Sequence, residues 1–206
     1  GASAADRTLA PGRHAACWAS DGLPSRRTMP GFLSHVAAVV ELSHAAVGPM
    51  LRRGRGWIVN VSSVAGLVSA PGFGHYSATK FAIEAITDAL RDEVAPHGIS
   101  VLTVEPGAFR TNAYAGFANE PVAEAIPGYH DMLEQVRAAF VEMDGMQPGD
   151  PRRGARAVIA AMAQDPPPRR LVLGSSGYDT VIDTLEQTLD DIRMNQSLSR
   201  SADFPA

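Results

Sequence analysis

The fold is decided in residues 57–63, where the chain reads Trp57-Ile58-Val59-Asn60-Val61-Ser62-Ser63. This short and nearly continuous apolar run is typical of a β-strand buried on both faces. Working outward, apolar residues recur at helical spacing over residues 32–53 before it and 76–95 after it. A second buried strand follows at residues 99–104 and ends at Pro106-Gly107. Helix, strand, helix, strand with short links predicts βαβ units on a parallel sheet, which is an α/β fold.

The rest of the chain continues this alternation less regularly. After an irregular stretch from Phe109 to about Gly149, the pattern predicts a helix over residues 151–163, a strand at Leu171-Val172-Leu173 and a last helix over residues 178–194. The turn at residues 174–177, Gly-Ser-Ser-Gly, is interpreted as a helix entry with serine capping.

Composition bounds the class of protein. The chain has 206 residues, enough for one sizeable domain, and a formal net charge of −4 without long single-sign blocks. This charge gives no reason to expect nucleic acid or an anionic membrane surface as a partner. The single cysteine, Cys17, excludes an internal disulfide and any CxxC metal site, so we expect no metal and a reducing compartment. With no apolar segment near the roughly 20 residues that span a bilayer, the sequence predicts a soluble cytoplasmic protein.

Lys80 is the only lysine beside seventeen arginines, and it follows Tyr76 by four residues in Tyr76-Ser77-Ala78-Thr79-Lys80. At i and i+4 on a helix the two side chains share one face. A cation there would lower the pKa of the phenol from about 10 and make Tyr76 a general acid/base. The alternative, a surface lysine near an ordinary core tyrosine, stays open on this pair alone.

Three motifs in order are more specific. Ser63 ends the first strand thirteen residues before Tyr76, within Gly56–Gly66. Together with Tyr-x-x-x-Lys at residues 76–80 and Pro-Gly-Ala-Phe-Arg-Thr at residues 106–111, this stretch resembles the short-chain dehydrogenase/reductase family. The resemblance is dense over roughly residues 33–112. It implies a Rossmann-like three-layer domain with a parallel sheet.

The resemblance also implies the chemistry. The expected reaction is hydride transfer between NAD or NADP and the carbon of an alcohol or ketone, with a small alcohol or carbonyl compound as substrate. Tyr76 would exchange a proton with the substrate oxygen, Ser63 would hydrogen-bond that oxygen, and Lys80 would bind the nicotinamide ribose and keep the tyrosine acidic. The resemblance adds the cofactor contacts Tyr76, Lys80, Pro106, Gly107, Phe109 and Thr111. Members of the family commonly pair through two helices, so a homo-oligomer is expected.

The chain departs from the family at its start. Residues 1–31 show no sustained period and no Gly-rich strand–turn–helix, so we interpret them as an irregular or non-homologous segment before a dehydrogenase-like domain at residues 32–206. The sheet is expected to lack its first βαβ units, and this N-terminal truncation would impair cofactor binding and activity. It is also expected to expose an edge, which favours association or poor solubility. Counting back from Leu42 places His35 where the family commonly has an asparagine. Either His35 relays protons, or the resemblance begins only after it.

Residues 109–149 occupy the place of the family's substrate lid. Their apolar side chains would suit a hydrophobic alcohol or ketone, or they simply pack the lid onto the domain. Two other functions remain open. One is a non-catalytic remnant or partner subunit that dimerises through helices 33–53 and 76–95. The other is a serine hydrolase with Ser62 or Ser63 as nucleophile and His75 as base, although the Gly-x-Ser-x-Gly elbow is missing.

Overall fold

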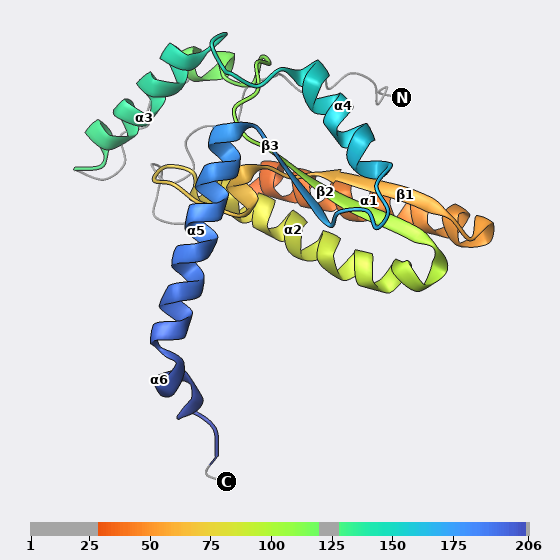
Figure 1. The fold of residues 1–206 in the computed structure, drawn as a ribbon. Helices are drawn as coiled ribbons and strands as arrows, with labels where there is room; N and C mark the ends of the chain where they lie inside the picture. Colours follow the sequence, from red (N-terminus) through yellow and green to blue (C-terminus); the bar gives the residue numbers. More distant parts are fainter. Residues whose placement is uncertain (1–28, 120–127, 205–206) are drawn as a thin grey trace, which may run out of the picture.

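The structure is a computed structural model that describes residues 29–119 and 128–204. Its sheet has three parallel strands in the order β1 (Gly56–Val61), β2 (Ile99–Pro106), β3 (Arg170–Leu173) (Figure 1). Helices α1 (Met29–Arg53) and α2 (Gly74–Val94) pack together along the sheet. The α/β prediction, with a parallel Rossmann-like sheet, is confirmed.

The central strand holds the core together because both of its faces are covered. On one face, Val101 joins Ile58, and Val47 of α1 and Leu90 of α2 pack against them. On the other face, Leu102 and Val104 pack against Ala161 of α4 (Pro151–Met162). Three layers result, with two helices on one face of the sheet and one helix on the other, which explains why β2 is buried along almost its whole length.

Most boundaries differ from the predicted ones by a few residues. Helix α1 begins at Met29, so residues 29–31, expected to be irregular, are helical, while residues 1–28 lie outside the described ranges. Strand β2 runs on to Pro106, and α2 starts two residues before Tyr76. Such ends carry little periodic signal, because helix and strand termini are made of capping and turn residues.

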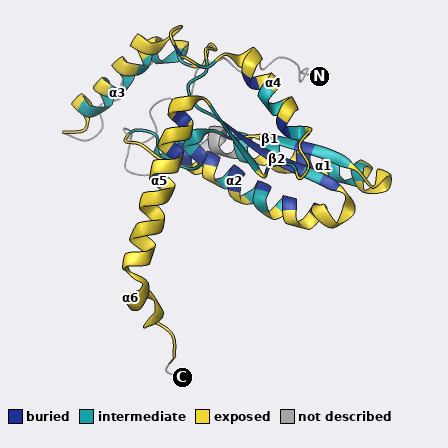
Figure 2. Cartoon of the chain, viewed as in Figure 1, coloured by how far each residue is buried: buried dark blue, intermediate teal, exposed yellow. Residues whose placement is uncertain are grey.

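The last helix shows one wrong interpretation. Helix α5 (Ser175–Met194) begins three residues before the predicted start, and its cap is Gly174, which offers no side-chain hydrogen bond. The two serines therefore lie inside the first turn and do not cap it. A short helix that was not predicted, α6 (Gln196–Arg200), continues the chain. Figures 1 and 2 show α5 and α6 reaching well beyond the sheet, with exposed residues along most of their length.

The segment between β2 and β3 is more ordered than expected. It contains a 3-10 helix, η3 (Ala115–Asn119), and the amphipathic helix α3 (His130–Met143). Its two ends meet: Arg110 donates its backbone N–H to the carbonyl of Gly149 at 2.8 Å, and Gly149 donates to the carbonyl of Ala108 at 3.0 Å. The predicted lid is therefore a closed excursion whose entry and exit lie side by side.

Strand β1 has one neighbour among the strands that the structure describes. Its outer edge leaves backbone donors and acceptors without a strand partner there, as the sequence predicted. Val61, at the end of this edge, is 58% exposed.

Candidate active site

Two strand ends and the start of a helix meet at one edge of the sheet. Ser63 follows β1, Pro106 ends β2, and Tyr76 lies in the first turn of α2. The Ser63 hydroxyl lies 3.5 Å from the Pro106 carbonyl oxygen and hydrogen-bonds with the Tyr76 phenol. It also accepts a hydrogen bond from the Ala65 N–H at 3.1 Å, which fixes the turn after β1. Ser63 and Tyr76 are thus brought together as predicted.

Lys80 completes the group from the next turn of α2. Its ammonium nitrogen lies 5.7 Å from the centroid of the Tyr76 ring, as the i, i+4 spacing requires. It donates a long hydrogen bond of 3.4 Å to the carbonyl of Val61. Lys80 is buried, and desolvation lowers its pKa, while the nearby Glu84 carboxylate opposes this shift.

The expected acidification of Tyr76 is not present in this structure. Burial raises the pKa of Tyr76, and the hydrogen bond from Ser63 only partly offsets the rise. The ammonium of Lys80 lies over the ring, 5.7 Å from its centroid, and burial of the phenol is the larger influence on its pKa. The group whose interaction lowers the phenol's pKa here is Ser63.

The other predicted cofactor contacts, Gly107, Phe109 and Thr111, lie in different surroundings. Gly107 passes close to the start of α5, where an added Cβ would lie 3.3 Å from the Leu173 carbonyl oxygen and 3.5 Å from Gly177 Cα. The ring of Phe109 packs over Gly154 of α4. Thr111 is exposed, and its hydroxyl accepts from Ala113 N–H at 3.3 Å. Pro106 therefore touches the Ser63 group, whereas in the described part of the chain no hydrogen bond joins Phe109 or Thr111 to Ser63, Tyr76 or Lys80.

Next to Lys80 lies a buried pair of carboxyl groups that the sequence analysis missed. Glu84, one turn after Lys80, and Glu105, at the end of β2, interact with each other. The guanidinium of Arg170 lies 3.2 Å from Glu84 Oε2 and 3.7 Å from Glu105 Oε1. The backbone N–H of Leu171 donates to Glu105 Oε2 at 3.0 Å.

The pKa of Glu105 is strongly perturbed. Burial raises the pKa of Glu105 to about 8, the Glu84 carboxylate adds to the rise, and Arg170 opposes it. Two anions so close in a buried site cannot both be charged without a large cost, so Glu105 is expected to hold its proton near neutral pH. The signal in the sequence was a glutamate in an otherwise apolar strand end.

Aromatic rings connect Tyr76 with the lid. Phe73 meets the Tyr76 ring edge-on at 6.5 Å between centroids and lies 5.1 Å from Phe140 of α3. Phe140 in turn stacks on Phe117 at 4.6 Å and meets Tyr114 at 4.7 Å. These five rings, which we call the aromatic cluster, place apolar surface of the lid next to the phenol. Burial and the proximity of Tyr76 both raise the pKa of Tyr114.

The serine hydrolase hypothesis gains no support from Ser62. Its side chain is buried, and its hydroxyl donates to the backbone carbonyl of Lys80 at 3.4 Å. Ser63 is engaged with the phenol, as described above. Among residues 29–119 and 128–204, no group of three or more His, Cys, Asp or Glu side chains could hold a metal, and no helix is long and apolar enough to cross a membrane.

Comparison with known proteins finds similarity to short-chain dehydrogenases. A family model described as short chain dehydrogenase matches residues 32–121, a range that includes His35, which is half-buried on α1. A crystal structure of a short-chain dehydrogenase from Streptomyces avermitilis is 35% identical, with a TM-score of 0.78 over 94% of this chain and 69% of its own.

Two curated relatives agree with this likeness. An uncharacterized oxidoreductase of Bacillus subtilis, YusZ, is 27% identical over 66% of this chain and 49% of its own length. A 3-ketodihydrosphingosine reductase of Bacteroides thetaiotaomicron is 33% identical over 66% of this chain and 50% of its own. The chain thus spans about half the length of these curated relatives.

Proposed function

Because the chain belongs to the short-chain dehydrogenase family, we propose that it carries the catalytic part of an NAD(P)-dependent oxidoreductase. The reaction would transfer a hydride between the nicotinamide and an alcohol or ketone carbon. The observation that carries this proposal is the hydrogen bond between Ser63 and Tyr76, with Lys80 one turn away on the same helix.

The residues at this edge fit the nicotinamide ribose end of the cofactor. An ammonium has three donors, and Lys80 gives one long hydrogen bond to Val61 among the described residues, so donors remain for ribose hydroxyls. When bound, the cofactor supplies or accepts the hydride. We expect the backbone at Pro106 and Gly107 to border the ring, and we keep Phe109 and Thr111 as predicted contacts that would have to move to reach it.

Tyr76 would hold the transferred proton. In the direction of ketone reduction the phenol donates this proton to the developing alkoxide, and a raised pKa keeps it protonated until then. Ser63 would donate a hydrogen bond to the same substrate oxygen, which requires it to release Tyr76 or Pro106. In alcohol oxidation the phenol must first lose its proton, and a bound ribose that draws Lys80 closer to the phenolic oxygen would favour that loss.

The aromatic cluster supports a hydrophobic substrate. It borders Tyr76 with the rings of Phe73, Phe140, Tyr114 and Phe117, which offer few polar groups to a ligand. The relative from Bacteroides thetaiotaomicron is named as the reductase of a keto compound, 3-ketodihydrosphingosine. We therefore propose an alcohol or ketone with an apolar body, whose oxygen reaches Ser63 and Tyr76.

Assembly and location remain predictions. The exposed Leu42 of α1 and Phe81 of α2 give these two helices an apolar outer surface that would suit a homo-oligomer. We keep residues 32–206 as the dehydrogenase-like domain and expect it in the cytoplasm, because one cysteine in the sequence suits a reducing compartment.

The test combines binding and turnover. Purified protein is titrated with NADH and NADPH, and cofactor oxidation is followed with long-chain and short-chain ketones. Tyr76→Phe should lower kcat by about 10²-fold or more, and Lys80→Ala should also weaken cofactor binding. Tyr129→Phe, at an exposed position, is the matched control and should change neither.

Several outcomes would contradict the proposal. Ketone reduction that survives Tyr76→Phe would remove the phenol from the mechanism. Ester hydrolysis that survives the same change would favour the hydrolase. If neither NADH nor NADPH binds to the folded protein, a non-catalytic partner subunit that dimerises through α1 and α2 would be favoured.

A further inference from the structure

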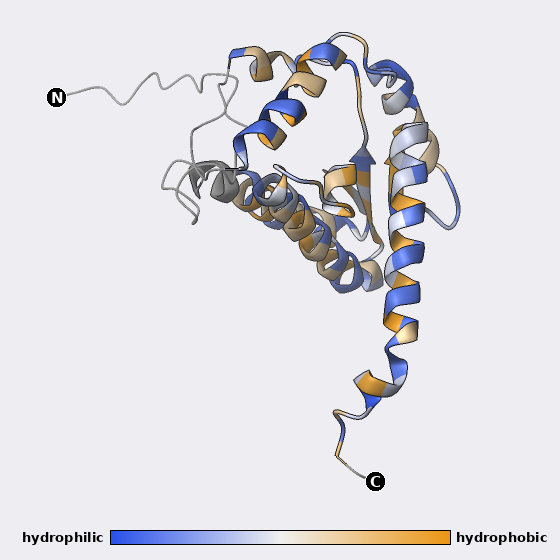
Figure 3. Ribbon diagram, turned by 90° about the vertical axis from the view of Figure 1, so that its left-hand side faces the viewer, coloured by the Kyte–Doolittle hydropathy of each residue, from blue (hydrophilic) through white to orange (hydrophobic). Residues whose placement is uncertain are grey.

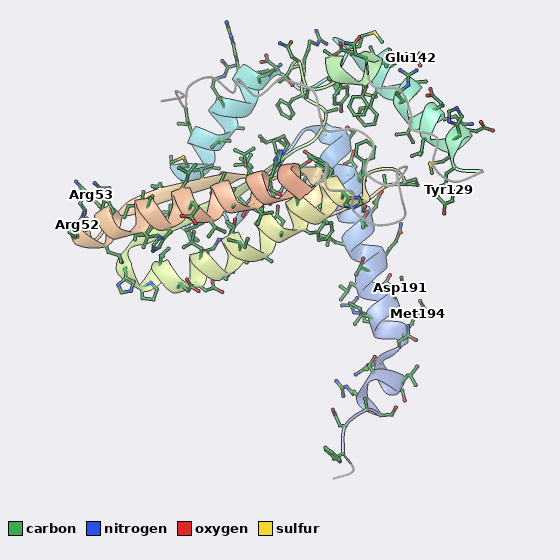
Figure 4. The ribbon with its side chains drawn as sticks, turned by 180° about the vertical axis from the view of Figure 1, so that it is seen from behind. Arg52, Arg53, Tyr129, Glu142, Asp191 and Met194 are labelled. Carbon is green, nitrogen blue, oxygen red and sulfur yellow. The ribbon has the colours of Figure 1, made fainter. Side chains whose placement is uncertain are left out.

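Helix α5 carries an apolar stripe that the rest of the described chain does not cover. Its first two turns pack on the domain, where Gly177 and Val181 are buried. Beyond them the helix extends away from the sheet (Figures 1 and 2). Figure 4 places Asp191 and Met194 on this far part of the helix. Four large apolar side chains along it are 37–63% exposed: Ile182, Leu185, Leu189 and Ile192.

The spacing of these four residues is that of a coiled-coil seam. They follow one another at intervals of three, four and three residues, so they occupy a single narrow stripe of the helix. Between Ile182 and Ile192 polar residues fill the remaining positions, and orange and blue bands alternate along α5 in Figure 3. A helix patterned in this way buries its stripe against another helix.

The stripe is symmetric about the level of residue 187. An antiparallel second copy with its two-fold axis there would set Ile182 against Ile192 of the partner subunit and Leu185 against Leu189 of the partner subunit. Each apolar residue of the stripe then meets an apolar residue of the other helix. A closed two-fold contact of this kind is the commonest form of homo-oligomer interface.

The charges beside the stripe favour the same arrangement. Asp179 and Arg193 are fourteen residues apart and lie along the same side of the stripe. Arg193 is exposed, and its ion pair to Asp190 is loose, at 3.6 Å. In the antiparallel pair Asp179 faces the partner's Arg193, and the contact occurs twice. Glu186 meets the partner's Glu186 near the axis, the one unfavourable charge contact in this register.

A parallel pair fits worse for two reasons. It would set Asp179 level with the partner's Asp179 and give no attractive charge pair along this side of the stripe. It would also bring both domains to the same end of the helices, because the first turns of α5 are packed on the domain at Gly177 and Val181. The antiparallel pair places the two domains at opposite ends.

We propose that α5 is a docking surface for a second copy of this chain, paired antiparallel through Ile182, Leu185, Leu189 and Ile192. This interface lies on a different element from the α1 and α2 surface discussed above. A chain that uses both would form an assembly larger than a dimer.

Sedimentation of the full chain over a range of concentrations tests the proposal. The double variant Leu185→Asp/Leu189→Asp should halve the mass of the assembly. The matched control, Thr180→Asp/Gln187→Asp, changes the opposite side of the same helix and should leave the mass unchanged. Circular dichroism checks that α5 still folds. An unchanged mass in the first variant, or the same loss in both, would overturn the proposal.

Charge exchange tests the antiparallel register without touching the apolar residues. Asp179→Arg and Arg193→Asp, each alone, set like charges against each other and should weaken association about tenfold at low salt. The two variants mixed should pair with each other, and the double variant Asp179→Arg/Arg193→Asp should regain wild-type affinity. Glu186→Gln should tighten it. Equal affinities throughout, or a wild-type chain that is monomeric or binds only a different protein, would refute the pairing.

Discussion

The first prediction concerns the proton that Glu105 holds in the folded chain. Burial raises the pKa of this carboxyl from its ordinary 4.5 to about 8. Between these two pH values the folded state binds more protons at Glu105 than the unfolded state does, so the contribution of this group to stability is full below pH 4.5 and falls as the pH rises toward 8. Glu105→Gln replaces the carboxyl group with a neutral amide that mimics its protonated form.

The magnitude follows from the two pKa values. At 1.36 kcal/mol per pH unit, the wild-type chain should lose about 3 to 4 kcal/mol of unfolding free energy between pH 5 and pH 8 through this group alone. The amide oxygen of the variant can still accept from the Leu171 N–H, so at pH 5 the two proteins should differ by less than about 1 kcal/mol. At pH 8 the variant should be the more stable one.

The assay is urea unfolding followed by circular dichroism at several pH values between 5 and 8. The informative quantity is the difference between variant and wild type, because histidine titrations affect both proteins alike. Glu93→Gln, which removes an exposed carboxylate from α2, is the matched control and should show a constant difference. If the difference for Glu105→Gln is also constant with pH, burial does not raise the pKa of Glu105 and the reasoning fails.

Three further predictions use the same site and its neighbours. Ser63→Ala should raise the pKa of Tyr76 further, because Ser63 opposes the effect of burial, and a phenolate absorbance titration that shows no change would contradict this. Gly66→Ala should destabilise the fold by about 1–3 kcal/mol in urea unfolding, since its Cβ would lie 2.6 Å from Ser62 Oγ. Gly48→Ala should change the unfolding free energy by less than about 1 kcal/mol, because helix propensity favours alanine whereas Pro49 at the next position disfavours a helical residue with a Cβ.

The meeting of Ser63 with Tyr76 and Lys80 could be predicted because it depends on local rules. A buried strand places its last residues at the carboxyl edge of the sheet, and an i, i+4 pair lies on one helix face wherever the helix lies. The resemblance to a known family was then enough to predict that Ser63 and Tyr76 lie together. No long-range contact had to be inferred from the residues alone.

The carboxyl pair could not be predicted in this way. Arg170 reaches Glu84 and Glu105 only when β3 lies beside β2, and 86 residues separate Arg170 from Glu84. The direction of the Tyr76 pKa shift could not be predicted either. It depends on where the Lys80 ammonium lies relative to the phenol, and the four-residue spacing is the same whether the ammonium lies at the oxygen or over the ring. The start of α5 was missed because its first turn carries serines and glycine in place of an apolar period.

The lid has a consequence for the evolution and engineering of specificity. Its two ends are joined through Arg110 and Gly149, and the flanking strands are paired in register from Thr103–Arg170 to Pro106–Leu173. The pairing of the strands therefore does not depend on the length of the loop between them. Doubling the length of such a loop costs only about 0.6 kcal/mol in closure entropy. We therefore expect the segment between these joined ends to be exchangeable as a unit. Its exchange would alter the apolar surface next to Tyr76, while Ser63 after β1 and Tyr76 on α2 would stay in place.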